Sequence, residues 1–241
     1  MKIAGFIQTS LVEWPGKIVS VVFVPGCNFR CPFCHNSHLV DPNRIRGLED
    51  YSEESVLSDL KKRRKFIDGV VVSGGEPTLQ PDLLEFLGKC QDLGLETMIE
   101  TNGSFPDTIR NLIARKLVNY IALDFKGPLD KRYAKVVGLR NFEPKIWIRS
   151  FKIILRSGIP FELRTTVVPG IHNEKVLVEM ARQIKKLAID NSQLRNWQLE
   201  NFQPKNCLDP EFEKIKPFSK TQLENFLAAV RGILPAVRLR E

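Results

Sequence analysis

The feature that most constrains the fold of this 241-residue chain is a regular alternation between short apolar runs and amphipathic helical patterns. Residues 18–24 form an apolar run rich in valine, which is typical of a strand buried on both faces. Residues 173–187 instead repeat apolar side chains at helical spacing, which predicts a helix. Further strands are predicted at 70–72, 95–100, 120–125, 161–168, 197–202 and 236–240, and further helices at 52–66, 81–94, 107–117, 145–156 and 219–231.

This alternation predicts an α/β fold that contains six consecutive βα units. Such units build a parallel sheet through right-handed crossovers, and a complete eight-unit barrel would need more chain. We therefore predict a partial (βα)6 barrel, with a flat doubly wound sheet as the alternative. The chain 1–241 is expected to form one domain, with its core at about 16–205 and a C-terminal helix and short strand at about 206–241.

Composition and charge restrict the classes of partner. Hydrophobic residues make up 43% and charged residues 27% of the chain, which is a globular composition. No apolar run has bilayer length and no signal peptide is recognisable, so we expect a cytoplasmic protein without a membrane partner. The net charge of +8 suits an acidic protein, an anionic substrate or nucleic acid. The densest basic run, 61–65, ends a predicted helix without interleaved aromatic residues, so we expect no nucleic-acid partner.

Residues that could bind a ligand follow the predicted strands at their carboxyl ends. In parallel α/β folds these strand ends lie on one rim, where ligand sites form. We therefore expect the residues at the strand ends to converge on one site. They are Cys27, the segment Ser73-Gly74-Gly75-Glu76, Thr101, Asn102, Asp124, Lys126, His172 and Gln203.

Three of the five cysteines crowd into the motif Cys27-x3-Cys31-x2-Cys34. In a reducing compartment such spacing indicates metal binding rather than a disulfide. Thiolates select iron–sulfur clusters or zinc, and a cluster held by three cysteines keeps one iron open for chemistry. Zinc is the alternative, with His35 or His38 as a fourth ligand, although both histidines also fit as ordinary loop residues.

The other two cysteines are far from this motif in the sequence. Cys90 shares a predicted helical face with Leu83 and Leu87, which indicates a core residue. Cys207 is isolated as well, and two isolated thiols do not make a second cluster site.

The cysteine motif, with Phe33 just before its last cysteine and with the segment at 73–76, resembles the radical S-adenosylmethionine (SAM) superfamily. The resemblance implies a partial (βα)6 barrel. It also implies that Cys27, Cys31 and Cys34 hold three irons of a [4Fe–4S] cluster, whose fourth iron binds SAM for reductive cleavage. By the same resemblance, Phe33 lies against the adenine and Ser73, Gly74, Gly75 and Glu76 hold the methionyl amine of SAM.

The resemblance implies further SAM contacts at the later strand ends. Thr101 and Asn102 would bind a ribose or carboxylate, or else form only a polar turn. Asp124 and Lys126 would contact SAM, or else form only a surface ion pair. Arg164, on the predicted strand 161–168, is a candidate partner of the SAM carboxylate. His172 could donate a proton, but we interpret it as a plain loop residue.

Residues 9–17 together with 27–36 resemble the activating proteins of anaerobic ribonucleoside-triphosphate reductase, which are glycyl-radical activases. This implies a glycyl-radical enzyme as partner. A positively charged face would suit an acidic protein, reduced flavodoxin or ferredoxin, as electron donor. Gln203 departs from the histidine expected in pyruvate formate-lyase activases. A predicted core that consumes nearly the whole chain leaves little sequence for a lid, which also favours a protein partner that covers the radical. The alternatives are a radical SAM enzyme acting on a small molecule or RNA base, and a non-enzymatic iron–sulfur electron carrier.

Overall fold

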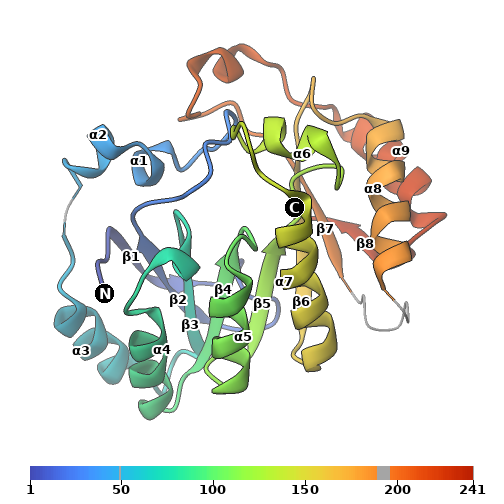
Figure 1. Ribbon diagram of the computed structural model, residues 1–241. Helices are drawn as coiled ribbons and strands as arrows, with labels where there is room; N and C mark the ends of the chain where they lie inside the picture. Colours follow the sequence, from blue (N-terminus) through green and yellow to red (C-terminus); the bar gives the residue numbers. More distant parts are fainter. Residues whose placement is uncertain (49, 189–195, 241) are drawn as a thin grey trace.

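A computed structural model describes residues 1–48, 50–188 and 196–240, and this part of the chain contains one sheet of eight strands (Figure 1). The order of the strands in the sheet is the same as their order in the sequence. The strands are β1 (Gly5–Ser10), β2 (Val19–Val24), β3 (Gly69–Gly74), β4 (Glu96–Thr101), β5 (Tyr120–Asp124), β6 (Phe161–Val167), β7 (Trp197–Asn201) and β8 (Val237–Leu239).

Strands β2 to β8 run parallel to one another, and β1 is antiparallel to β2. The sheet curves into an open partial barrel whose two edges are β1 and β8 (Figure 1). The predicted α/β partial barrel is therefore confirmed. The sequence analysis missed β1, because an edge strand with half-exposed and exposed side chains lacks the apolar signature of the inner strands.

The longer helices cover the outer face of the sheet (Figure 1). The helices that follow strands are α4 (Leu83–Asp92), α5 (Pro106–Ala114), α6 (Lys131–Val136), α7 (Pro144–Ser157), α8 (Glu174–Leu187) and α9 (Lys220–Arg231), and the β2–β3 connection holds α1 (Ser37–Val40), α2 (Pro42–Ile45) and α3 (Glu53–Arg63). The described residues also form the 3-10 turns η1 (Pro77–Leu79) and η3 (Pro210–Lys214). The side chains of Ser52, Asn173 and Ser219 cap their helices, as the polar residues at these starts indicate. The short helices α1, α2 and α6 were not predicted, since four to six residues show no clear helical period.

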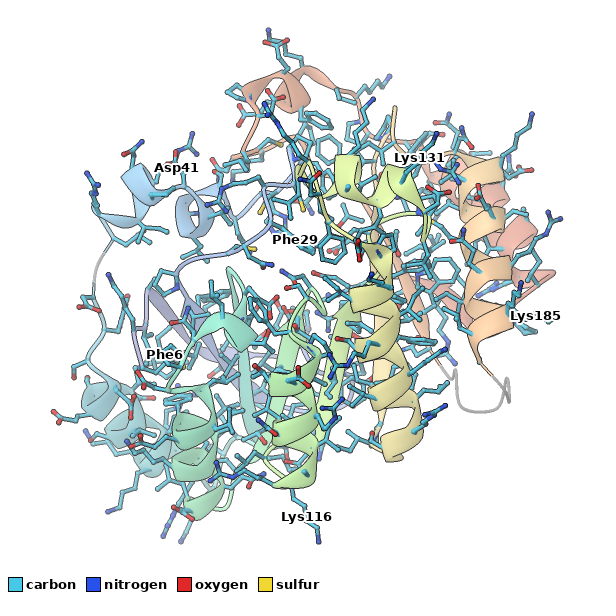
Figure 2. The ribbon with its side chains drawn as sticks, in the orientation of Figure 1. Phe6, Phe29, Asp41, Lys116, Lys131 and Lys185 are labelled. Carbon is cyan, nitrogen blue, oxygen red and sulfur yellow. The ribbon has the colours of Figure 1, made fainter. Side chains whose placement is uncertain are left out.

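Alternate side chains of each strand face opposite sides of the sheet. Val22 and Val72 pack outward into the main core beneath the helices, whereas Val21 and Val71 pack inward with Trp14. This inner apolar cluster fills the interior below the carboxyl ends of the strands, so a cavity is left above it. In Figure 2, Phe29 marks the carboxyl-end rim and Lys116 points away at the opposite end. Among the described residues no helix is long and apolar enough to cross a membrane.

Candidate cofactor site

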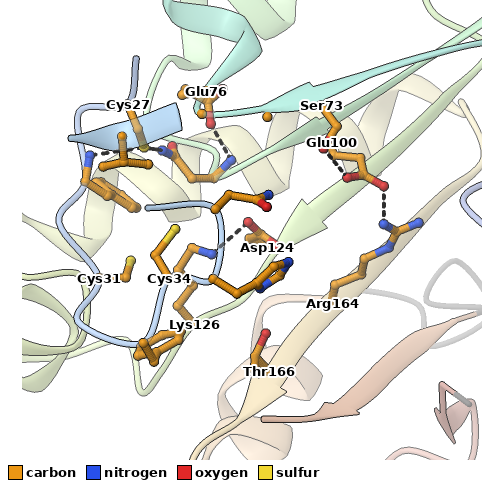
Figure 3. A pocket seen from close by; sticks show the side chains of 18 of the residues that line it. Cys27, Cys31, Cys34, Ser73, Glu76, Glu100, Asp124, Lys126, Arg164 and Thr166 are labelled. Carbon is orange, nitrogen blue, oxygen red and sulfur yellow. Dashed lines mark hydrogen bonds and ion pairs between the residues drawn. The ribbon is translucent and has the colours of Figure 1, made fainter. Parts of the chain in front are cut away.

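A cavity of about 320 Å³ opens at the carboxyl ends of the strands (Figure 3). Its size lies at the lower end of the range typical of small-molecule sites. Most of the residues expected to form a site line it, although they come from the cysteine loop after β2, from the ends of β3, β4 and β5, and from β6. Those residues are Cys27, Cys31, Phe33, Cys34, Ser73, Gly74, Gly75, Glu76, Asn102, Asp124, Lys126 and Arg164.

The cysteine loop is fastened to the end of β3 by backbone contacts. The amide of Gly75 donates to Val24 O at 2.8 Å, and the amide of Glu76 donates to Gly26 O at 2.8 Å. A Cβ atom on Gly75 would lie 2.0 Å from Gly26 O, and one on Gly74 would lie 2.5 Å from Val24 O. The two glycines therefore permit the close approach that brings the loop and the strand end together.

The three motif cysteines lie in the cavity wall, where Cys31 is buried and Cys27 and Cys34 are half-buried. Burial raises the pKa of Cys27 and of Cys31 to about 12, and it also raises the pKa of Cys34. The Lys126 ammonium opposes this effect at all three thiols. Cys27 Sγ also accepts hydrogen bonds from the Phe29 amide at 3.3 Å and from Asn102 Nδ2 at 3.7 Å. Lys126 and these two donors therefore offset only part of the cost that burial places on negative charge at the sulfur atoms.

Glu76 is almost fully buried and bound by protein donors on both oxygens. Its carboxylate accepts from the Thr101 hydroxyl at 2.6 Å, from the Asn102 amide at 2.7 Å and from the Thr78 amide at 3.0 Å, and it also accepts from the Thr78 hydroxyl. Burial raises its pKa against these bonds. Thr101 thus lies behind the cavity wall, where it ties the end of β4 to the turn after β3.

Asp124 and Lys126 form an ion pair with 2.8 Å between Oδ2 and Nζ, at the end of β5 (Figure 3). The Lys126 side chain is 20% exposed, so the pair is less solvated than an ordinary surface pair. Burial lowers the pKa of Lys126, but Asp124 and Cys31 outweigh it, and the pKa is raised. Lys126 therefore keeps its positive charge beside the thiols.

Arg164 lies in the cavity wall but faces carboxylates of the protein. Its Nε donates to Glu162 at 2.5 Å, and its guanidinium also pairs with Glu100. Burial raises the pKa of Glu100, although Arg164 acts against this rise, and the Ser73 hydroxyl donates to the same carboxylate at 2.5 Å. Arg164 thus joins β4 and β6 across the barrel interior.

Comparison with known proteins places this arrangement in a family. Residues 21–183 match the radical SAM superfamily. The chain belongs to this superfamily. A protein of Methanocaldococcus jannaschii, provisionally named a glycyl-radical enzyme activating enzyme, is 33% identical over 242 residues, which cover 99% of this chain and 95% of the relative. The chain is accordingly an enzyme of the radical SAM type, and its membership implies SAM and a [4Fe–4S] cluster.

Two further comparisons extend this result. The pyruvate formate-lyase-activating enzyme of Clostridium pasteurianum is 30% identical over 222 residues, which cover 89% of this chain and 86% of the relative. The crystal structure of Streptococcus suis SuiB bound to the precursor peptide SuiA matches with a TM-score of 0.67 and 16% identity, over 92% of this chain and 48% of that chain. At this identity the match to SuiB shows the fold alone.

The donor set of the cavity fits the cluster that the superfamily implies. Three soft ligands line one wall, a fixed cation lies beside them, and amide donors point at Cys27. In the described residues, no three His, Cys, Asp or Glu side chains converge closely enough to hold a single metal ion. His35 borders the cavity, whereas His38 is an exposed residue of α1.

Several residues of the site were missed by the sequence analysis. Glu13, Thr166, Glu200 and Arg240 also line the cavity. The alternation of the strands could have identified the two that lie within them, since Thr166 and Glu200 are on the inward face. Glu13 and Arg240 gave no such signal, because their positions depend on contacts between distant parts of the chain.

The isolated cysteines are both buried. Cys90 lies in the core, as expected from its helical face. Cys207 is close enough to Cys34 for that thiol to raise its pKa, after the larger effects of burial and Glu213. The segment around it crosses the cysteine loop, where the Asp209 amide donates to Pro32 O at 2.9 Å. Distance in the sequence thus concealed the proximity of Cys207 to the site.

Proposed function

We propose that this chain is a glycyl-radical activase. In this proposal it cleaves SAM reductively and uses the resulting radical to remove a hydrogen atom from a glycine Cα of a separate protein. The observation that carries the proposal is the convergence of Cys27, Cys31 and Cys34 with the Asp124–Lys126 pair around one cavity. The activase names of two relatives that align along most of their length support the choice of a protein target.

Different residues would bind the cluster and SAM. Cys27, Cys31 and Cys34 would hold a [4Fe–4S] cluster, which supplies the electron and the open iron site for SAM when it is bound. Asp124 and Lys126 offer opposite charges that suit the amine and the carboxylate of the methionyl group. We also assign to the binding of SAM the residues Ser73, Gly74, Gly75, Glu76, Thr101, Asn102 and Arg164, and we place Phe33 against the adenine.

The position of Glu76 and Arg164 modifies their proposed roles. Protein donors already occupy the Glu76 carboxylate, so it would shape the amine site through the turn that it fastens. Arg164 would orient Glu100 and Ser73 in the same indirect way. A glycine target suits the reaction, because its Cα carries no side chain and its backbone reaches conformations that other residues avoid.

For the target we propose an anaerobic ribonucleoside-triphosphate reductase, on the basis of residues 9–17 and 27–36. Gln203, at the end of β7, borders a small cavity with Phe33 and His35, where a pyruvate formate-lyase activase is expected to carry histidine. Pyruvate formate-lyase is the second candidate, because the clostridial relative bears that name. The net charge of +8 supports an acidic flavodoxin or ferredoxin as electron donor in the cytoplasm.

The test is anaerobic incubation of the reconstituted enzyme with SAM, reductant and each candidate partner, followed by electron paramagnetic resonance. We expect a protein-borne radical on the reductase, together with 5′-deoxyadenosine and methionine. Deuterium placed at Cα of the partner glycine should appear in the deoxyadenosine. Label that arrives only from a small metabolite or an RNA base, without a radical on either protein, would refute the activase proposal.

A further inference from the structure

Three successive backbone carbonyls at the end of β5 each accept a hydrogen bond from a side chain. The donors come from three separate elements, namely α7, β6 and the turn between β6 and α8. The bonds join Trp147 Nε1 to Asp124 O (2.7 Å), Thr165 Oγ1 to Phe125 O (2.5 Å) and His172 Nε2 to Lys126 O (3.1 Å). Successive carbonyls in a short segment point in different directions, so three bonds from different sides fix the segment in position and in rotation.

The protonation state of His172 follows from its surroundings. Its Nδ1 accepts from the Val168 amide at 3.0 Å, so Nε2 carries the hydrogen and donates to Lys126 O. The residue is 2% exposed, and burial lowers its pKa to about 4. His172 is therefore a neutral bridge between two strand-end turns at physiological pH, rather than a plain loop residue.

The other two donors are themselves held in place. Trp197 Nε1 donates to Thr165 Oγ1 at 2.9 Å, which leaves the hydroxyl hydrogen of Thr165 for Phe125 O. The Phe125 ring lies between two indoles, with ring centroids 4.9 Å from Trp147 and 5.7 Å from Trp197. The segment is thus fixed through its backbone and through its central side chain.

This segment presents Asp124 and Lys126 to the cavity, on either side of the buried Phe125. We propose that Trp147, Thr165 and His172 form a positioning clamp that sets the place of the Asp124–Lys126 pair and thereby the affinity for SAM. The inference rests on the proposed SAM site. Among the residues that the structure describes, those that line the cavity do not include Trp147, Thr165 or His172, so the clamp would act on SAM only through the Asp124–Lys126 pair. A long lysine side chain reaches a fixed ligand well only when its backbone is fixed, because its own rotamers are many.

The first test compares two threonine substitutions. Thr165→Val removes the clamp hydroxyl, and Thr97→Val removes a buried hydroxyl that donates to Leu117 O at 2.9 Å, near the start of β4. We expect both variants to lose stability in denaturant, because each leaves a buried carbonyl without its donor. Thr165→Val alone should raise the dissociation constant for SAM, by about tenfold, at unchanged iron content.

A second test separates the two bonds of His172. Asparagine can accept from the Val168 amide as Nδ1 does, but its shorter side chain does not extend to Lys126 O. His172→Asn should therefore retain more stability than His172→Ala and yet bind SAM as weakly as His172→Ala. SAM binding is measured by equilibrium dialysis of reconstituted protein without a partner enzyme, and stability is measured on the protein without iron.

Wild-type SAM affinity in Thr165→Val or in His172→Asn would overturn the clamp, since only the stability would then depend on these bonds. A loss of SAM affinity in Thr97→Val equal to that in Thr165→Val would overturn it too. Because no partner protein takes part, these results do not depend on which glycyl-radical enzyme is activated. A failed activation assay with an intact pattern of SAM affinities would refute the proposed function and leave the clamp in place.

Discussion

At the scale of single residues, the spacing of three cysteines and the strand-end positions of Ser73, Asp124 and Lys126 could be read from the sequence. Their convergence in one cavity follows from the parallel sheet, which places the carboxyl ends of its strands on one rim. The hydrogen bonds of Glu76 could not be predicted, because its partners Thr101 and Asn102 belong to a different strand.

The hydrogen bond from the Asp209 amide to Pro32 O brings the segment of Cys207 to the cysteine loop, so the ligand assignment can be tested against Cys207. We expect Cys27→Ala, Cys31→Ala and Cys34→Ala each to abolish the [4Fe–4S] absorbance and SAM cleavage, because in the proposed site these three thiolates hold the cluster. Cys207→Ser should keep both, as should Cys90→Ser in the core, which serves as the control. Iron analysis and visible absorption measure the outcome, and a lost cluster in Cys207→Ser would contradict the assignment.

At the scale of elements, the inner strands and the longer helices could be predicted because burial imposes a clear period on them. The antiparallel β1 and the short α6 could not, since contacts with β2 and with the cysteine loop stabilise them instead. Val137, just after α6, accepts from the Arg30 amide at 2.9 Å. The conformation of the turn after β3 could not be predicted either, because it depends on contacts with the neighbouring loop at Gly26.

That turn leads to a prediction about Gly75. A methyl group at Gly75 would meet Gly26 O at 2.0 Å, so Gly75→Ala must push the cysteine loop away from β3. We expect Gly75→Ala to prevent cluster assembly and to lower the free energy of unfolding by about 2 kcal/mol or more. Gly88 lies within α4, and a Cβ atom there would have Leu117 Cδ2 as its nearest neighbour at 3.8 Å, so Gly88→Ala should be neutral or slightly stabilising. Equal iron content in both variants would refute the argument.

At the scale of the whole molecule, the two edges of the sheet are joined by side chains of residues that follow β1 and β8. Arg240 Nη2 donates to Glu13 Oε2 at 2.7 Å and to Val12 O at 3.1 Å. Glu13 O in turn accepts from Arg164 Nη2 at 2.8 Å. A chain of hydrogen bonds through Arg240, Glu13 and Arg164 therefore spans the open side of the barrel. No local pattern in the sequence predicts this chain.

We predict that this link stabilises the barrel. Glu13→Gln should lower the free energy of unfolding by about 2 kcal/mol, as expected for a partly buried hydrogen bond between charged groups. Glu211→Gln removes an exposed ion pair with Lys214 and should change it by less than about 0.5 kcal/mol. Denaturant titration measures both free energies of unfolding. Equal effects would show that the Glu13–Arg240 link stabilises the barrel no more than an exposed ion pair does.

The burial of the motif thiols also has a consequence for maturation. With pKa values of about 12 for Cys27 and Cys31, the newly folded chain carries these sulfur atoms in protonated form at neutral pH. Each iron–sulfur bond then displaces a hydrogen ion, so loading of the site releases acid and becomes more favourable as the medium turns alkaline. Until loading occurs, the same protonation leaves the sulfur atoms poor nucleophiles and slow to oxidise. If these cysteines are the ligands that we propose, the protein without iron therefore keeps them in a form that can still bind the cluster.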